Sequence, residues 1–275
     1  MIKTFSSRTC AFDAEWVPCA ATARRLLELP NTTGDREAFE AIWRHYAREG
    51  DERPFLKLML SKVVTIAAVF RTVDRDGAPK LTLFGRRCDT AGEGPMIAEF
   101  LERVAEGSWQ LWGFNSAAAD VPIMKQRAVA LGIPLPTFSK RPPKPWDGMD
   151  YHDARNSDAH MDILDILGGF SAAARPSLNE LAVACSFPGK LDVSGADVAE
   201  RYLAGRLDEI LEYNETDAVT THLAMLRLGF VTAHLSQRSY RRELDAVSQL
   251  VDVQVSAGKQ QFAKFRAAWD AMRDA

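Results

Sequence analysis

Residues 9–16, with the sequence Thr-Cys-Ala-Phe-Asp-Ala-Glu-Trp, decide the fold of this 275-residue chain. Residues 9–15 are predicted to form the first β-strand. Side chains alternate between the two faces of a strand, so Asp13 and Glu15 should share one face while Phe12 and Ala14 share the other. We therefore expect an N-terminal strand with two carboxylates on one face and apolar side chains on the opposite face.

The two neighbouring carboxylates need an explanation. Like charges repel, and burying either carboxylate without a partner is expensive. A hard divalent cation with oxygen ligands would remove both costs. The alternative is an edge strand whose acidic face is simply solvated, and this segment alone leaves both interpretations open.

The rest of the chain predicts one α/β domain that spans residues 1–275. Residues 63–70 and 80–84 should form a hairpin around the turn at Asp76-Gly77, and everything after Ser177 is helical in character. The core should cover about residues 9–230, followed by a C-terminal helical extension at about 231–275. The order of elements favours a mixed sheet flanked by helices. Further helices are predicted at 35–48, 95–105 and 121–131, and further strands at 110–114 and 161–167.

Two more acidic segments carry candidate chemistry. Residues 113–122, GFNSAAADVP, place Asp120 where a helix should start, and an acidic residue at such a point is also a common helix cap. In residues 211–219, LEYNETDAV, Tyr213 and Asp217 are four apart and share one helix face. There they could hold a water or face a common metal. An amphipathic helix with a half-buried tyrosine would explain the same spacing.

Taken together, the three segments resemble the DEDD exonuclease superfamily in its tyrosine-bearing subclass. In particular, the chain is similar to the predicted 3′-to-5′ exonucleases related to the exonuclease domain of family-B DNA polymerases. The likeness runs from about Thr9 to Leu228. Its motifs are FDAEW, GFNSAAADVP and YNETDAVTTH, with further likeness at residues 160–165 and 187–190. Trp16, where a small or hydroxylated residue is usual, and Ala119, where a bulky one is usual, depart from the pattern.

The resemblance implies an RNase H-like fold, two divalent metal ions and hydrolysis from a 3′ end. It implies that Asp13, Glu15, Asp120 and Asp217 hold the metals, with Asp13 bridging both ions. Tyr213 would orient the attacking water. All-oxygen sites favour hard cations, so Mg²⁺ is the expected ion and Mn²⁺ a plausible substitute.

Composition limits the class of partner. The net charge is −3, and removing the four proposed ligands leaves 34 basic against 33 acidic residues, or +1. A near-neutral remainder argues against a broad basic surface that coats a nucleic-acid duplex, and it fits an enzyme that grips a few nucleotides at one end.

No stretch reaches the roughly 20 apolar residues of a membrane span. The acidic residues near the N-terminus argue against a signal peptide. Four scattered cysteines indicate reduced thiols and a cytoplasmic location.

The expected substrate is nucleic acid with a free 3′ end, most plausibly single-stranded DNA, and DNA repair is the setting that this chemistry suggests. Candidate substrate contacts are Trp16, Phe114, Asn115 and Lys190, although core packing explains Phe114 better and a solvated turn explains Lys190 equally well. Three alternatives stay open. They are a non-catalytic nucleic-acid-binding module of the same fold, a 3′-to-5′ exoribonuclease, and a proofreading nuclease that serves a polymerase in trans.

Overall fold

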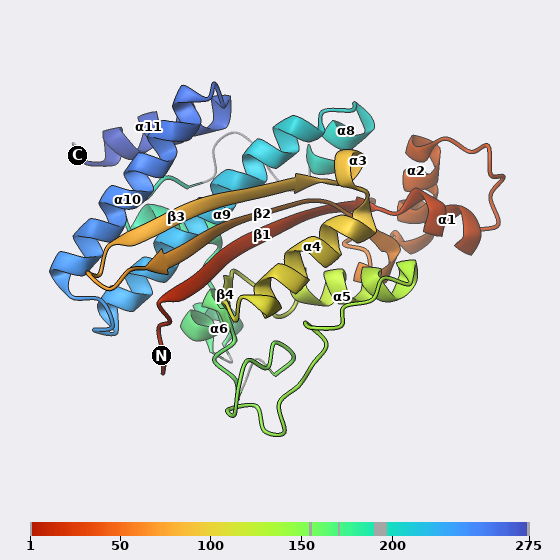
Figure 1. Ribbon diagram of the computed structural model, residues 1–275. Helices are drawn as coiled ribbons and strands as arrows, with labels where there is room; N and C mark the ends of the chain where they lie inside the picture. The colour runs from red at the N-terminus through yellow and green to blue at the C-terminus, as the bar shows by residue number, and fades with distance from the viewer. Residues whose placement is uncertain (1, 154–155, 170, 190–196, 274–275) are drawn as a thin grey trace.

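A five-stranded mixed sheet forms the centre of the computed structural model, which describes residues 2–153, 156–169, 171–189 and 197–273. The strand order is β3-β2-β1-β4-β5. The pairs β1/β2 and β2/β3 are antiparallel, whereas β1/β4 and β4/β5 are parallel (Figure 1). The expected RNase H-like mixed sheet is therefore confirmed. The strands are β1 (Arg8–Pro18), β2 (Ser61–Val73), β3 (Pro79–Arg87), β4 (Gln110–Gly113) and β5 (His160–Asp162).

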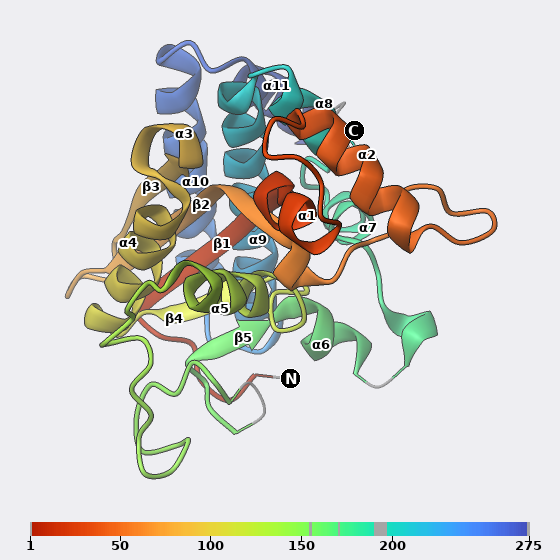
Figure 2. The same cartoon turned by 90° about the vertical axis from the view of Figure 1, so that its right-hand side faces the viewer.

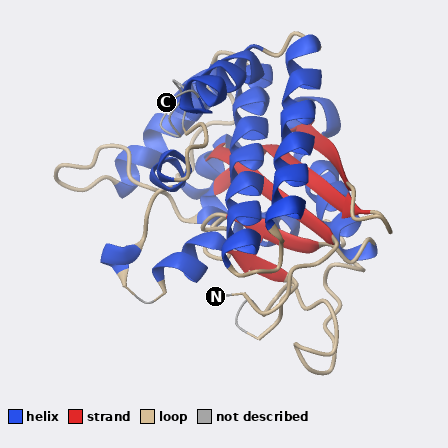
Figure 3. Ribbon diagram, turned by 90° about the vertical axis from the view of Figure 1, so that its left-hand side faces the viewer, coloured by secondary structure: helices blue, strands red, loops and turns tan. Residues whose placement is uncertain are grey.

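Helices cover both faces of the sheet. Figure 1 shows α4 and α5 in front of it and α9 behind it, and Figure 3 shows the long helices of the second layer lying across the strands. The helices are α1 (Ala20–Leu26), α2 (Asp35–Tyr46), α3 (Cys88–Ala91), α4 (Glu93–Glu106), α5 (Asp120–Leu131), α6 (Ile163–Gly168), α7 (Leu178–Ala184), α8 (Val198–Leu203), α9 (Leu207–Val231), α10 (Gln237–Ser256) and α11 (Gln260–Arg273), with 3-10 turns η1 (Leu58–Leu60) and η2 (Ala172–Ala174).

The two faces of β1 belong to two different hydrophobic clusters. Phe12 and Ala14 pack with Phe100 and other residues on the α4/α5 side. Ala11 packs with Val219 of α9 on the opposite side. Because successive side chains alternate, Asp13 and Glu15 lie on the α9 side, as Ala11 does. The period-two pattern of the first strand therefore directs both carboxylates toward the helix that carries the third acidic segment.

Two local predictions were wrong. Residues 161–167 do not continue as a strand, because α6 begins at Ile163. The carboxylate of Asp162 accepts hydrogen bonds from the backbone N–H groups of Leu164 and Asp165, and this N-cap turns the chain into a helix. The only helix predicted between β1 and β2 was the one at 35–48, but that connection contains α1 as well as α2 (Figure 2). It also contains η1 just before β2.

The C-terminal helices pack onto the core. Residues of α10 and α11, including Val247, Phe262 and Trp269, join the cluster on the α9 side. Arg71 of β2 and Glu243 of α10 form a fully buried ion pair at 2.6 Å. These contacts place α10 beside α9 on the same face of the sheet, with α11 packed against both helices. Among the described helices, none is both long enough and apolar enough to cross a membrane.

Candidate active site

Three carboxylates converge where β1 meets α9. One ligand oxygen from each of Asp13, Glu15 and Asp217 can be chosen so that all three lie within 4.8 Å of one another. The first two come from the α9-facing side of β1, and Asp217 comes from the middle of α9. Asp217 is buried, while the other two are half-buried and open toward solvent. Segments about 200 residues apart in sequence are thus brought to one point.

Tyr213 lies next to Asp217 and close enough to Glu15 and Asp13 to feel their charges. It is buried on α9 one turn before Asp217, to which its hydroxyl donates a hydrogen bond. Burial, followed by the charges of Asp217, Glu15 and Asp13, raises the pKa of the phenol far above its usual value of 10. The hydroxyl therefore stays protonated and remains a hydrogen-bond donor at any physiological pH.

Asn214 belongs to the site and was not predicted from the sequence. Its amide nitrogen donates a 2.7 Å hydrogen bond to Asp13 Oδ2 across the β1–α9 interface. The side chain is fully buried, and within the described part of the chain its Oδ1 has no hydrogen-bond partner. A buried amide is costly unless it is bonded, so the bond to Asp13 fixes both groups. The sequence feature that could have indicated this role is the polar run NETD, residues 214–217, in the middle of a largely apolar helix.

Asp120 lies beside the three-carboxylate cluster rather than within it. Pairing of β4 with β1 ends at Ala11, so the edge of β1 beyond that residue is open. Asp120 Oδ1 accepts the backbone N–H of Ala14 there at 3.1 Å. Asp120 is the first residue of α5, and the N-cap position is Ala119, so the helix-cap alternative does not describe it. Burial, assisted by the charge of Asp162, raises its pKa to about 7.

Asp162 supports the loop that carries Asp120. Its two carboxylate oxygens accept the backbone N–H groups of Asn115 at 2.9 Å and Ala117 at 2.8 Å. Asn115 has a positive φ of 60°, a conformation that asparagine tolerates better than most residues. Asp162 thus holds the turn between β4 and α5 in place, which is a structural role.

The candidate substrate contacts are placed differently from one another. Trp16 is half-buried, packs on the α4/α5 cluster and touches Phe55. Phe114 is half-buried and packs on the α9-side cluster, as the core-packing alternative expected. The backbone of Asn115 is engaged by Asp162. Lys190 lies outside the described residues.

The donor set fits hard cations. The oxygens of three carboxylates face one another, and a bound cation would relieve their mutual repulsion. The oxygen-only character of the set suits Mg²⁺ or Mn²⁺, whereas zinc sites usually include at least one histidine nitrogen or cysteine sulfur. Asp120, with a pKa raised by burial, is a fourth carboxylate that a neighbouring positive charge would help to ionise.

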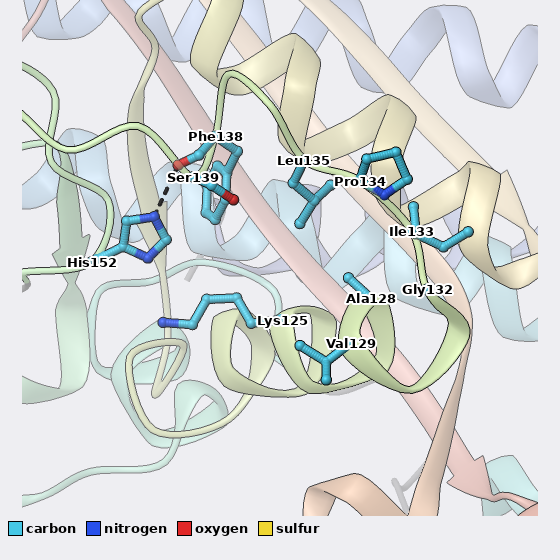
Figure 4. A pocket seen from close by; sticks show the side chains of 10 residues that line it. All are labelled: Lys125, Ala128, Val129, Gly132, Ile133, Pro134, Leu135, Phe138, Ser139 and His152. Atoms are coloured by element: carbon cyan, nitrogen blue, oxygen red, sulfur yellow. Dashed lines mark hydrogen bonds between the residues drawn. The ribbon is translucent and has the colours of Figure 1, made fainter.

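Two hollows bear on where a ligand could enter. One of about 430 Å³ adjoins the acidic cluster, because Glu15 is part of its lining together with aromatic residues. Another of about 360 Å³ lies between α5 and the loop that follows it (Figure 4). There the ring of His152 forms a 2.9 Å hydrogen bond with the carbonyl of Phe138. The side chain of Lys125 extends toward the His152 ring. The described residues that line this second hollow include no carboxylate, unlike those at the acidic cluster.

The comparisons with known proteins agree with this geometry. Residues 53–269 match the family described as a predicted 3′-5′ exonuclease related to the exonuclease domain of PolB. The chain belongs to this exonuclease family. The matched region includes Asp120, Tyr213 and Asp217, and it begins after Asp13 and Glu15, which β1 adds to the same site.

Solved structures support the fold of this exonuclease family member. It is similar to the family B DNA polymerase from the hyperthermophilic archaeon Pyrobaculum calidifontis, with a TM-score of 0.50 and 18% sequence identity. The match covers 81% of this chain and 24% of that polymerase, so the chain spans about a quarter of its relative's length. No curated protein matches the chain.

Proposed function

We propose that this protein is a metal-dependent 3′-to-5′ exonuclease that hydrolyses phosphodiester bonds at the 3′ end of nucleic acid. The observation that carries the proposal is the convergence of Asp13, Glu15 and Asp217 within 4.8 Å, with Tyr213 hydrogen-bonded to Asp217. Membership of the exonuclease family supports it. The alternative, a strand whose acidic face is simply solvated, does not explain why the buried side chains of Asp217 and Tyr213 lie beside Asp13 and Glu15.

The proposed cofactors are two divalent ions, Mg²⁺ in the first place and Mn²⁺ as a substitute. Asp13, Glu15 and Asp217 would hold one ion, and Asp13 with Asp120 would hold the other. When bound, such ions supply Lewis-acid stabilisation of the charge that develops on the phosphate and on the leaving oxygen. In this arrangement Glu15 and Asp217 would hold the ion on one side of the substrate phosphate, and Asp120 would hold the ion on the other side.

The remaining residues act through hydrogen bonds. Tyr213 keeps its proton because burial and the adjacent carboxylates raise its pKa, so its hydroxyl can hold and orient the attacking water. Asn214 holds Asp13 in one rotamer through the 2.7 Å bond from its amide. Such supporting contacts orient ligand groups, and their loss typically costs about 10–100-fold in cation affinity or activity.

The proposed substrate is single-stranded DNA with a free 3′ end. Trp16, Phe114, Asn115 and Lys190 stay candidate substrate contacts, of which Trp16 has the best position because it lies beside Glu15 at the adjoining hollow. A polymerase acting in trans is the proposed partner, and the proposal treats residues 1–275 as one exonuclease domain located in the cytoplasm.

Digestion of matched DNA and RNA oligonucleotides labelled at the 5′ end, with Mg²⁺, Mn²⁺ or EDTA, tests the proposal. We expect a ladder of stepwise shortened labelled DNA with either metal and intact strands in EDTA. Faster shortening of RNA would identify an exoribonuclease, and intact strands in every lane would identify a binding module without activity. Release of a labelled mononucleotide from the 5′ end would contradict the stated polarity.

A further inference from the structure

A row of three residues across the sheet leaves room for α9 at the level of the acidic cluster. Asp13 of β1 lies opposite Ala67 of β2, which lies opposite Gly85 of the edge strand β3. A Cβ added at Gly85 would lie 2.6 Å from Glu215 Oε1 and 3.1 Å from Leu211 Cδ1. Glycine suits a place where another segment approaches the backbone this closely. It thus lets one turn of α9 rest directly on β3.

Glu215 is a buried carboxylate of α9 that lies outside the three-carboxylate cluster. Its Oε2 accepts a hydrogen bond from Nζ of Lys259, which lies between α10 and α11, and the two side chains form an ion pair. The Glu215 side chain is 5% exposed and that of Lys259 is 27% exposed. Removing one partner of such a pair leaves an uncompensated charge in the protein interior. The position of Glu215 on β3 therefore depends on Lys259.

The turn between α10 and α11 holds Lys259 in a defined place. Gly258 has a positive φ of 84°, which favours glycine, and it directs the chain from α10 into α11. The ammonium of Lys259 lies 5.5 Å from the ring centroid of Phe262, a fully buried residue of α11. A second contact comes from the same segment, because the backbone N–H of Gln261 donates to Glu212 Oε2 at 3.2 Å. The α10–α11 turn thus contacts α9 at two carboxylates.

The neighbours Asn214 and Glu215 anchor α9 on two sides. Asn214 donates to Asp13 of β1, whereas Glu215 lies against β3 and the α10–α11 turn. Anchors on different sides of one helical turn oppose rotation of the helix about its own axis. Tyr213 and Asp217 belong to the same stretch of α9, so their placement against β1 follows from these anchors.

We propose that Lys259 is a positioning residue that acts through Glu215 to set the place of Asp217 in the acidic cluster. The inference rests on the proposed function, because that function requires the acidic cluster to hold a cation. The groups of a binding site have to be held within about 0.5 Å of their working geometry. Supporting contacts of this kind typically contribute about 10–100-fold in cation affinity or activity. The C-terminal helices thus contribute to cation affinity from outside the acidic cluster.

Mn²⁺ binding tests the inference without relying on hydrolysis. The electron paramagnetic resonance signal of free Mn²⁺ would give the Kd of native protein and of Lys259→Met, which keeps the aliphatic stem and loses the charge. We expect the Kd to rise about tenfold or more. Removing a positive charge near the acidic cluster would by itself favour Mn²⁺ and lower the Kd. A raised Kd therefore reports a displaced ligand rather than a changed charge.

A double variant separates positioning from stability. Lys259→Met should lower the Tm in EDTA, because Glu215 is left buried and unpaired. Adding Glu215→Gln removes the unpaired charge, so the Tm should recover, whereas the Kd for Mn²⁺ should stay raised. Lys259→Arg keeps the ion pair and should keep both the native Tm and the native Kd.

The matched control is Lys80→Met, which removes an exposed lysine of β3 with the same change in net charge. It should leave the Tm and the Kd unchanged. Gly85→Ala displaces Glu215 from the side of the sheet without altering any charge, and it should also raise the Kd.

An unchanged or lower Kd in Lys259→Met, or in Gly85→Ala should the former not fold, would overturn the inference. Recovery of the Kd together with the Tm in the double variant would reduce Lys259 to charge compensation and overturn it as well. Native protein that binds no Mn²⁺ would refute the metal-dependent function and this inference with it. Native protein that binds Mn²⁺ as tightly as Lys259→Met does would refute this inference alone.

Discussion

Replacing Asp217 with asparagine should make the metal-free protein more stable while it destroys the proposed activity. Asn keeps the size of the side chain and can still accept the hydrogen bond of Tyr213. It removes a charge that lies within 4.8 Å of Asp13 and Glu15. At that distance and an effective dielectric constant of about 20, each pair repels by about 3 kcal/mol before screening. Asp13 and Glu15 are half-exposed, and solvent screening leaves about 1–2 kcal/mol in total.

Thermal unfolding in EDTA and in MnCl₂ measures this effect. For a chain of this size, 1 kcal/mol corresponds to roughly 2–4 °C in Tm, so Asp217→Asn should unfold a few degrees above native protein in EDTA. Mn²⁺ should raise the Tm of native protein by mass action and leave that of the variant almost unchanged. Asp245→Asn, the same replacement at an exposed position of α10, is the control and should behave as native protein does. A lower Tm of Asp217→Asn in EDTA, together with full stabilisation by Mn²⁺, would refute the reasoning.

Three further predictions concern single residues of the site. The pKa of Asp120 is raised from 3.8 to about 7 in the fold. The protonated carboxyl therefore contributes its full stability below about pH 4, and this contribution is lost as the pH rises through 7. The Tm of metal-free protein should fall between these pH values, and the Tm of Asp120→Asn should change less over the same range. Tyr213→Phe keeps the buried ring and removes the hydroxyl, so kcat should drop on the order of 10²-fold with little change in KM; steady-state kinetics that show only a raised KM would speak against the assigned role. Asn214→Ala removes the 2.7 Å bond to Asp13 and should raise the Mn²⁺ concentration for half-maximal rate by roughly 10–100-fold; an unchanged metal titration would show that Asp13 needs no such support.

Much of the site could be predicted because it depends on local periodicity. Alternation along β1 correctly placed Asp13 and Glu15 opposite Phe12 and Ala14, and the four-residue spacing placed Tyr213 and Asp217 on one face of α9. Such patterns survive folding because a strand or a helix repeats its geometry at every residue.

Other features depend on contacts that no local pattern encodes. The role of Asn214 requires knowing that α9 lies directly against β1. The meeting of Trp16 and Phe55 joins β1 to the far end of the long connection between β1 and β2. The strand predicted at 161–167 failed because an apolar run of that length suits either a strand or a helix, and the capping carboxylate of Asp162 decided for the helix.

The most direct measurement of the central claim compares native protein with Asp13→Ala, purified identically, on a strand labelled at the 5′ end in the presence of Mn²⁺. Asp13 is the carboxylate that Asn214 holds and that faces both Glu15 and Asp217. We predict that native protein shortens the strand stepwise from its 3′ end and that Asp13→Ala, although folded, leaves it intact. Digestion by Asp13→Ala at the native rate would contradict the assignment of the acidic cluster as the hydrolytic centre.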